Sequence, residues 1–221
     1  MTITKNINLF EQIRVLKFNR HYRIGDLILA GGMRWRIDRE TILSDPKYKD
    51  SILFKYLKTI DINSSQEKNW KSLISILKKI KKPSKNNFCI HIRCGDIATD
   101  NQFHKNCFIF NRDRLMHAID NFLDSQTSSI TIVAAMHYGS NDLLNNRYSY
   151  TDHNYSVNKE IMNNILYSIE QEFKLPINIF QTSSDDIKFI DESFLELVFS
   201  DKCILDNGGF GHCIRHVRNH L

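Results

Sequence analysis

The sequence predicts an α/β fold built on a doubly wound, mainly parallel sheet. Short apolar segments alternate with amphipathic segments of helical period throughout residues 84–221. This alternation favours parallel strands joined by right-handed helical crossovers, with helices on both faces of the sheet. Of the 221 residues, 42% are hydrophobic and 25% are charged, which is the composition of a globular protein.

The order of the elements follows from periodicity and breaks. Residues 88–93 alternate along a strand, and 129–136 form a buried apolar run. Between Asn158 and Phe173, apolar residues recur every three or four positions, which predicts a helix that ends before Pro176. The expected strands are 88–93, 129–136, 176–180 and 202–206, and the expected helices are 111–124, 158–173, 191–200 and a closing helix after 206.

The first part of the chain differs from the rest in charge. Residues 1–83 carry 18 Lys and Arg against 8 Asp and Glu, a net +10, whereas 84–221 carry 12 against 17, a net −5. The sign changes at the polar stretch 81–87, which contains Pro83. We therefore expect two domains, 1–83 and 84–221. The first segment should contain a strand near 13–18, a Gly-marked turn at 23–26 that leads into a helix or strand, and a basic amphipathic helix at 67–82.

Composition and motifs exclude several classes of protein. No run approaches the ~20 apolar residues of a membrane span, and the first residues lack a signal-peptide pattern. We expect a cytoplasmic protein whose basic segment could contact a membrane surface peripherally. The five cysteines form no CxxC pair, which argues against disulfides and structural zinc.

The sequence also lacks the motifs of several enzyme classes. Walker A, GxSxG, HExxH and DxD motifs are absent, so we expect no metal site. Trp70 lies on the apolar face of the basic helix, which favours a solvated lysine face over a nucleic-acid site.

The first candidate site follows the strand 88–93. His91 and Arg93 lie on one face of this strand, near its carboxyl end, and Asp96 follows in the next loop after Gly95. In open α/β sheets, ligands bind beyond the carboxyl ends of the strands. The alternative is a structural ion pair between Arg93 and Asp96 with a histidine bonded to backbone.

Two further polar loops follow predicted strands. Gly208, Gly209 and Phe210 precede the closing helix, where glycines and free N–H groups could hold a phosphate. Ser183, Ser184 and Asp185 follow the strand 176–180 and could contact a base or ribose. The alternatives are a tight strand-to-helix connection and a helix cap, respectively. Because all three loops follow strands of one sheet, they are expected on the same rim.

The order of these motifs resembles the fucosyltransferase superfamily. The likeness covers about residues 86–217 and rests on Ile90-His91-Ile92-Arg93-Cys94-Gly95-Asp96, on Thr182-Ser183-Ser184-Asp185-Asp186, and on the stretch from Phe194 to Phe210. It is similar to the GDP-fucose-binding half of α-1,2-, α-1,6- and protein O-fucosyltransferases. The resemblance implies a GT-B-like, metal-independent, inverting enzyme that needs no cofactor besides its GDP-fucose donor.

The resemblance also implies roles for particular residues. Arg93 would neutralise the β-phosphate of the leaving group, with Asp96 as the second catalytic candidate. His91 would lie near the nucleotide, and Ser183, Ser184 and Asp185 would contact base, ribose or phosphate. We expect Gly208, Gly209 and Phe210 to complete the nucleotide site.

Three functions remain open on the sequence alone. The first is a glycosyltransferase in which residues 1–83 form a reduced acceptor-side domain for an anionic glycan, a lipid-linked acceptor or a membrane surface. The second is a non-catalytic nucleotide- or glycan-binding module. The third is a heptosyltransferase-like GT-B enzyme with another nucleotide sugar, because Gly25-Asp26 resembles the Gly-Asp turn near the start of those enzymes. Besides these three, a nucleic-acid-associated protein that uses the basic first segment stays an alternative, although no nucleic-acid partner is expected.

Overall fold

The chain folds into two compact units that are each discontinuous in sequence. The computed structural model describes residues 9–17, 24–29, 39–61, 63–80, 88–98, 104–138, 150–182 and 185–221. The first unit comprises Met1–Phe18, Asn86–Gln181 and Asp201–Asp206. The second comprises Asn19–Lys85, Thr182–Ser200 and Asn207–Leu221. We call them the sheet unit and the helical unit.

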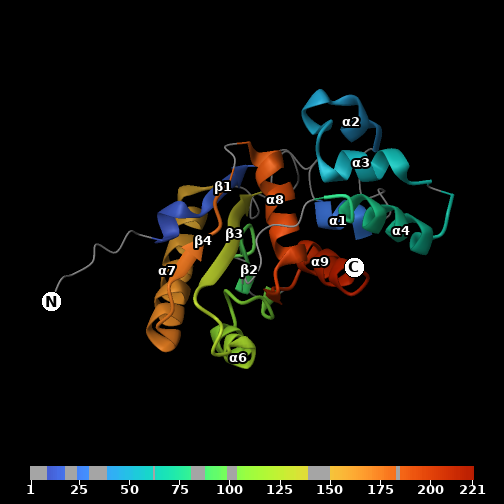
Figure 1. Ribbon diagram of the computed structural model, residues 1–221. Helices are drawn as coiled ribbons and strands as arrows, with labels where there is room; N and C mark the ends of the chain where they lie inside the picture. The colour runs from blue at the N-terminus through green and yellow to red at the C-terminus, as the bar shows by residue number, and fades with distance from the viewer. Residues whose placement is uncertain are drawn as a thin grey trace. The chain divides into compact units, whose positions relative to one another are not determined.

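The sheet unit contains a five-stranded parallel sheet (Figure 1). The strand β3 (Ile130–Tyr138) pairs with β2 (Phe88–Gly95), which in turn pairs with β5 (Lys202–Leu205). The other edge of β3 is shared by two short strands. β4 (Ile177–Ile179) pairs with its beginning, and β1 (Arg14–Lys17) pairs with its end.

The strand order identifies where the sheet reverses its winding. Across the sheet, the strands lie in the order β4, β3, β2, β5, and β1 pairs with the same edge of β3 as β4 does. This order is consistent with a Rossmann-like fold. The chain winds from β2 through β3 to β4 on one side, then crosses to β5 on the other side of β2. The carboxyl ends of β2 and β5 therefore form the topological switch point.

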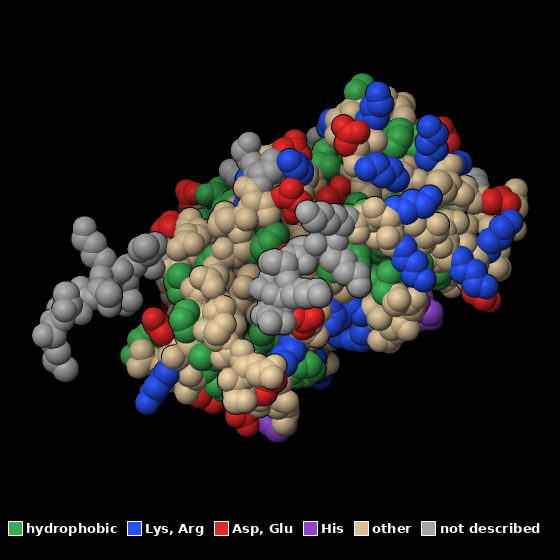
Figure 2. All heavy atoms as spheres, viewed as in Figure 1, with side chains coloured by type: hydrophobic (Ala, Val, Ile, Leu, Met, Phe, Trp, Pro, Cys, Tyr) green, Lys and Arg blue, Asp and Glu red, His purple; other side chains and the backbone are tan. Residues whose placement is uncertain are grey.

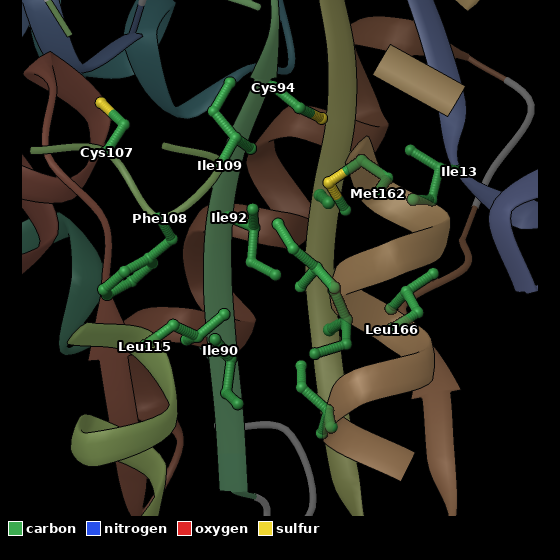
Figure 3. Close-up of a cluster of buried hydrophobic side chains, with 14 of the residues drawn as sticks. Ile13, Ile90, Ile92, Cys94, Cys107, Phe108, Ile109, Leu115, Met162 and Leu166 are labelled. Carbon is green, nitrogen blue, oxygen red and sulfur yellow. The ribbon is translucent and has the colours of Figure 1, made fainter. Parts of the chain in front are cut away.

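One face of the sheet carries a continuous apolar core (Figure 3). Alternate residues of β2 and β3 point to this face, where they meet α6 (Arg112–Phe122) and α7 (Asp152–Phe173). The short helix η1 (Leu9–Gln12) adds Phe10, which is fully buried. Figure 3 shows Ile90 and Ile92 between Leu115 on one side and Leu166 on the other. Burial of these isoleucine and leucine side chains is the main stabilising term of this unit.

The helical unit consists of seven short or medium helices among the residues described. They are α1 (Ile24–Leu29), α2 (Arg39–Ser44), η2 (Pro46–Tyr48), α3 (Ile52–Thr59), α4 (Gln66–Leu77), α8 (Asp186–Phe199) and α9 (Gly209–Arg218). The helices α1 and α9 approach closely at Gly25, where a Cβ would lie 2.6 Å from the carbonyl oxygen of Gly209. Glycine is therefore required for this helix contact.

Most predicted elements are confirmed, with differences at their ends. The predicted strands correspond to β1–β5. Residues 24–26, predicted as a turn, instead form the first part of the helix α1. α7 begins six residues earlier than expected because Thr151 caps it, accepting a hydrogen bond from Asn154 N. α8 begins five residues earlier because Asp185 caps it. α2, η2 and α3 were not predicted. The polar stretch 81–87, where the net charge changes sign, lies outside the described residues.

The division into units differs from the predicted boundary between 1–83 and 84–221. β1 pairs with β3, so residues near the start of the chain belong to the sheet. α8 and α9 pack on each other, and α9 packs on α1, so the end of the chain joins the helical unit. Charge separates the sequence at residue 83, but pairing and packing divide the fold differently. None of the described helices is long and apolar enough to cross a membrane.

Candidate functional site

Chemically versatile side chains gather at the switch point of the sheet unit. β2 ends with His91, Arg93 and the turn that carries Asp96, and β5 is followed directly by Asp206. His91, Asp96 and Asp206 are all buried, whereas Arg93 is partly exposed. This is the edge at which parallel sheets bind ligands. We call these four residues the switch-point cluster.

The turn after β2 requires glycine at position 95. Gly95 has a φ of 95°, and a Cβ there would lie 2.4 Å from both the backbone nitrogen and the carbonyl oxygen of His137 in β3. The next residue, Asp96, donates its backbone N–H to the carbonyl of His137 at 2.7 Å. The chain thus turns tightly over the end of β3, and this turn fixes the position of the Asp96 side chain.

Asn158 of α7 holds the same turn from the other direction. Its side-chain oxygen accepts the N–H of Gly95 at 2.7 Å, and its Nδ2 donates to the carbonyl of Gly95 at 3.0 Å. Nδ2 also lies 3.0 Å from the hydroxyl of Tyr138 and 2.7 Å from the carbonyl of Asn154. Asn158 is 1% exposed. The amide therefore pairs with both backbone groups of the glycine in a water-excluded position.

Asp206 connects β5 to two other segments. Its Oδ2 accepts the backbone N–H of Arg93 at 2.9 Å, and its Oδ1 accepts that of Phe108 at 3.0 Å. Asp206 is completely buried, and its own N–H donates to the carbonyl of His91 at 3.3 Å. A buried carboxylate needs such charge-assisted hydrogen bonds. The bonds bring the segment around Phe108 to the carboxyl ends of β2 and β5.

The Arg93 guanidinium is positioned without being fully engaged. One of its nitrogens lies 3.7 Å from a carboxylate oxygen of Asp96, and this is its only ion pair within the described part of the chain. The distance exceeds that of a bidentate arginine–carboxylate pair. The Arg93 side chain is 28% exposed and that of Asp96 is 6% exposed. Arg93 therefore keeps N–H donors for an incoming anion, while Asp96 restricts where the guanidinium points.

Burial raises the pKa of two thiols and one phenol near this site, and the buried carboxylates add to the effect on the thiols. Burial, with smaller effects of Asp206 and Asp96, raises the pKa of Cys94, whose thiol donates to the carbonyl of Ala135. Burial and Asp206 raise the pKa of Cys107 to about 11. Burial is also the main cause of the raised pKa of Tyr138. These groups stay protonated at neutral pH, so neither thiol acts as a nucleophile.

The remaining predicted site residues belong to the helical unit. Asp185 is exposed and caps α8 by accepting the N–H of Lys188 at 2.8 Å, which is the cap that the sequence left as an alternative. Gly208 has a φ of 127° and precedes α9, whose first residue is Gly209. The Phe210 ring packs edge-on against the Phe194 ring, with 6.0 Å between the ring centroids. Ser183 and Ser184 lie outside the described residues.

Two important residues were not among the predicted site residues. The sequence prediction includes Asp206 only as the end of the expected strand 202–206, although an acidic residue that ends an apolar strand is a usable signal. Asn158 gave no signal, because nothing in the sequence distinguishes it from the other asparagines of the same helix. Its role depends on the packing of α7 beside the turn at Gly95.

The described residues contain no group of three or more His, Cys, Asp or Glu side chains that could hold a metal ion. All five cysteines are free thiols. In comparisons with known proteins, no protein-family model, no curated protein and no solved structure matches this chain. The functional argument therefore depends on the site itself.

Proposed function

We propose that the protein is a glycosyltransferase that uses a nucleotide-sugar donor, with GDP-fucose as the first candidate. The observation that carries the proposal is Arg93: a partly exposed guanidinium with donors to spare, at the switch point of a parallel sheet. The planar fork of arginine matches the oxygens of a diphosphate. The resemblance of the motif around Arg93 to fucosyltransferases supports the choice of donor.

The chemistry requires positive charge where the leaving group forms. An acceptor hydroxyl attacks C1 of the sugar and releases its proton to solvent, while the bond from C1 to the diphosphate oxygen breaks and its electron pair leaves with the nucleoside diphosphate. Arg93 would stabilise the growing negative charge through fixed N–H donors, as oxyanion-type sites do. Asp96 would orient the guanidinium. In this proposal no metal is needed, and inversion at C1 follows from a single displacement.

The helical unit would supply the acceptor side. Figure 2 shows Lys and Arg side chains spread over the region of α2, α3 and α4. Lysines 55, 58, 68, 71, 78 and 79 are all exposed there. This positive surface favours an anionic glycan or a lipid-linked acceptor, at a cytoplasmic location that includes peripheral contact with a membrane.

A second candidate is a non-catalytic nucleotide- or glycan-binding module. The observation that favours it is the hydrogen bond from the backbone N–H of Phe108 to Asp206. This bond holds part of the protein's own chain at the switch point, where the proposed donor would bind. A heptosyltransferase-like enzyme with a different nucleotide sugar is a variant of the first candidate. These functions differ in whether a donor is cleaved and in which nucleotide is bound.

Two measurements separate these functions. The first is a thermal-shift panel of GDP, UDP, CMP and ADP. A nucleotide at ~100 times its Kd raises stability by ~2.7 kcal/mol, or about 5–10 °C for a chain of this size. We expect GDP to give the largest shift, unchanged by EDTA. The second is release of GDP from GDP-fucose by the purified protein. Binding without release would support the module, and a larger shift with UDP or CMP would exclude GDP-fucose as the donor.

Variants of Arg93 test the residue that carries the proposal. We expect Arg93→Lys to lose nearly as much donor cleavage as Arg93→Ala, because a point charge cannot make the bidentate contact. The expected loss is ~2–4 kcal/mol of transition-state stabilisation. Arg112→Lys is the matched control, since Arg112 is a surface arginine that donates to the Ser168 hydroxyl. Full activity of Arg93→Lys would show that Arg93 is a structural ion-pair partner of Asp96.

A further inference from the structure

The turn before α9 contains the one Asn-Gly pair of the sequence, Asn207-Gly208. The side chain of an asparagine reacts with the backbone nitrogen of the next residue most readily when that residue is glycine, because no Cβ shields the nitrogen. Asn207 lies at a bend between β5 and α9, where it is half-buried. The turn therefore combines a reactive pair of residues with partial access to solvent.

The backbone nitrogen of Gly208 is not held as a hydrogen-bond donor. Within the described part of the chain its N–H makes no hydrogen bond, although the Gly208 carbonyl accepts the N–H of His212 at 2.9 Å. Gly208 also has a φ of 127°, a conformation that favours glycine. Its nitrogen can therefore lose its proton and approach the Asn207 side chain without losing a hydrogen bond of its own.

Two other asparagines of the helical unit precede polar residues, but there the neighbouring nitrogen is engaged. Asn63 is followed by Ser64, whose N–H donates to the carbonyl of Asp61 at 3.0 Å. Asn219 is followed by His220, whose N–H donates to a carbonyl of the same turn at 3.0 Å. A nitrogen that donates such a bond keeps its proton and its orientation. Of these three pairs, the fold leaves only the nitrogen of the glycine open to reaction.

We propose that Asn207 is a site of spontaneous deamidation in the folded protein. The Gly208 N–H gives its proton to hydroxide, and the nitrogen forms a bond to Cγ of Asn207. The bond from Cγ to Nδ2 then breaks, and Nδ2 takes up a proton from water and leaves as ammonia. A second water molecule opens the cyclic imide and yields aspartate or isoaspartate at position 207. Overall, water replaces ammonia, and no oxidant is needed.

The products also suit their position in the fold. Both carry a carboxylate directly before the start of α9 (Gly209–Arg218), where the unpaired N–H groups of the first helical turn favour negative charge. The charge of the neutral amide thus changes by one unit at a place that accommodates an anion. The proposal is independent of the donor chemistry at Arg93.

Peptide mapping of the full chain tests the proposal directly. Trypsin releases the site in a peptide that contains no other asparagine, residues 203–215, whereas Asn63 lies in the peptide 59–68. Protein is incubated at physiological temperature at neutral and at mildly alkaline pH, and each sample is compared with one digested at time zero. Mass spectrometry measures the conversion of amide to carboxyl, and enzymatic methylation detects isoaspartate. We expect conversion at Asn207 that grows with time and in proportion to hydroxide, and none at Asn63 or Asn219 over the same period.

Two variants and one peptide assign the reaction. Asn207→Gln should lose the product, because the longer side chain closes its ring far more slowly, and an unaltered melting curve establishes that this variant is folded. Asn63→Gln is the matched control and should leave conversion at Asn207 unchanged. A synthetic peptide of residues 203–215 gives the rate without the fold, and we expect the folded protein to convert at a comparable rate. The proposal is overturned if the peptide converts while the folded protein does not, if Asn63 or Asn219 converts as fast as Asn207, or if the rate does not rise with pH.

Discussion

The two units bury polar side chains in different places. In the sheet unit, the polar residues buried among those described are all at or beside the carboxyl edge of β2, β3 and β5: His91, Asp96, Asn154, Asn158 and Asp206. In the helical unit, several buried or half-buried polar groups satisfy helix ends. Asp191 accepts the N–H of Ile52 at the start of α3. Arg218 donates to three carbonyls at the end of α8, those of Leu197, Val198 and Ser200.

This difference indicates which unit uses buried polar side chains to hold candidate ligand-binding residues in place. Polar groups at helix ends replace hydrogen bonds that any helix lacks at its termini, so they explain stability alone. Asn158 and Asp206 instead hold a turn and a loop. Two fully buried polar anchors from distant parts of the chain fix the segment between Arg93 and Asp96. Functional sites need such support around the residues that contact a ligand.

The largest expected effect is that of Gly95→Ala in the sheet unit. The substitution adds a Cβ 2.4 Å from two backbone atoms of β3 at a position with a φ of 95°. A strand backbone in the middle of a sheet cannot move aside, so we expect a loss of about 3–5 kcal/mol in the free energy of unfolding. Urea denaturation followed by circular dichroism measures it. Hydrogen exchange should become faster in β2 and β3 and stay unchanged in α3 and α4.

Asp206→Ala should give the next largest effect. It leaves the backbone N–H groups of Arg93 and Phe108 without their acceptor, which should cost about 2–4 kcal/mol. Asp185→Ala is the matched control from the helical unit, because this exposed cap accepts one N–H and should cost about 0.5–2 kcal/mol. Chemical denaturation gives both values. If the two losses are equal, Asp206 contributes no more than an ordinary cap.

Gly25→Ala tests close packing in the helical unit. The added Cβ would lie 2.6 Å from the carbonyl oxygen of Gly209, but two helices can separate slightly, whereas paired strands cannot. We therefore expect a loss of about 1–3 kcal/mol, smaller than that of Gly95→Ala. Thermal melting monitored by Trp70 fluorescence follows this unit. A larger loss than for Gly95→Ala would show that the α1–α9 contact is the more rigid of the two.

Periodicity made much of the fold predictable. Strand alternation and helical spacing located β2, β3, β5 and α6 to within a few residues, because these elements have one clear apolar face. Sequence patterns missed α2, η2 and α3 because these helices are short. Asp45 caps η2 and Ser51 caps α3, but neither cap stands next to a long apolar pattern that would mark a helix. The boundary at residue 83 depended on charge. Charge reflects the surface of a chain, and it carries no information about which segments pair in a sheet.

The candidate site was predictable only where residues are close in sequence. His91, Arg93 and Asp96 lie on one strand and its turn, so strand geometry was enough to group them. The contributions of Asn158 and Asp206 come from segments that reach the turn through tertiary packing. Asp185 shows the opposite case, in which a polar residue suited to a ligand also suits a helix cap. Sequence pattern alone could not separate those alternatives.

The smallest expected effect concerns two ion pairs with exposed carboxylates, one in each unit. In the sheet unit, the hydrogen bonds from Lys202 and then from Thr127 lower the pKa of Asp124 from 3.8 to about 2. In the helical unit, Lys71 lowers the pKa of Glu67 one turn away. A carboxylate with a lowered pKa stabilises the fold above its ordinary pKa. That contribution is lost as the pH falls from about 4 towards 2, when the native carboxylate takes up its proton.

Replacing each lysine tests whether the pKa values of the two carboxylates return to their ordinary values to the same extent. Lys202→Met should raise the pKa of Asp124 only partway, because Thr127 Oγ1 still donates to the carboxylate at 2.9 Å. Lys71→Met should return the pKa of Glu67 close to its ordinary value, since Lys71 is the one residue of the described part of the chain that lowers it. Carboxyl carbon shifts measured by NMR during acid titration report both. Because both carboxylates are exposed to solvent, the free energy of unfolding at neutral pH should barely change. Complete normalisation of Asp124 in Lys202→Met would show that the bond to Thr127 does not persist in solution.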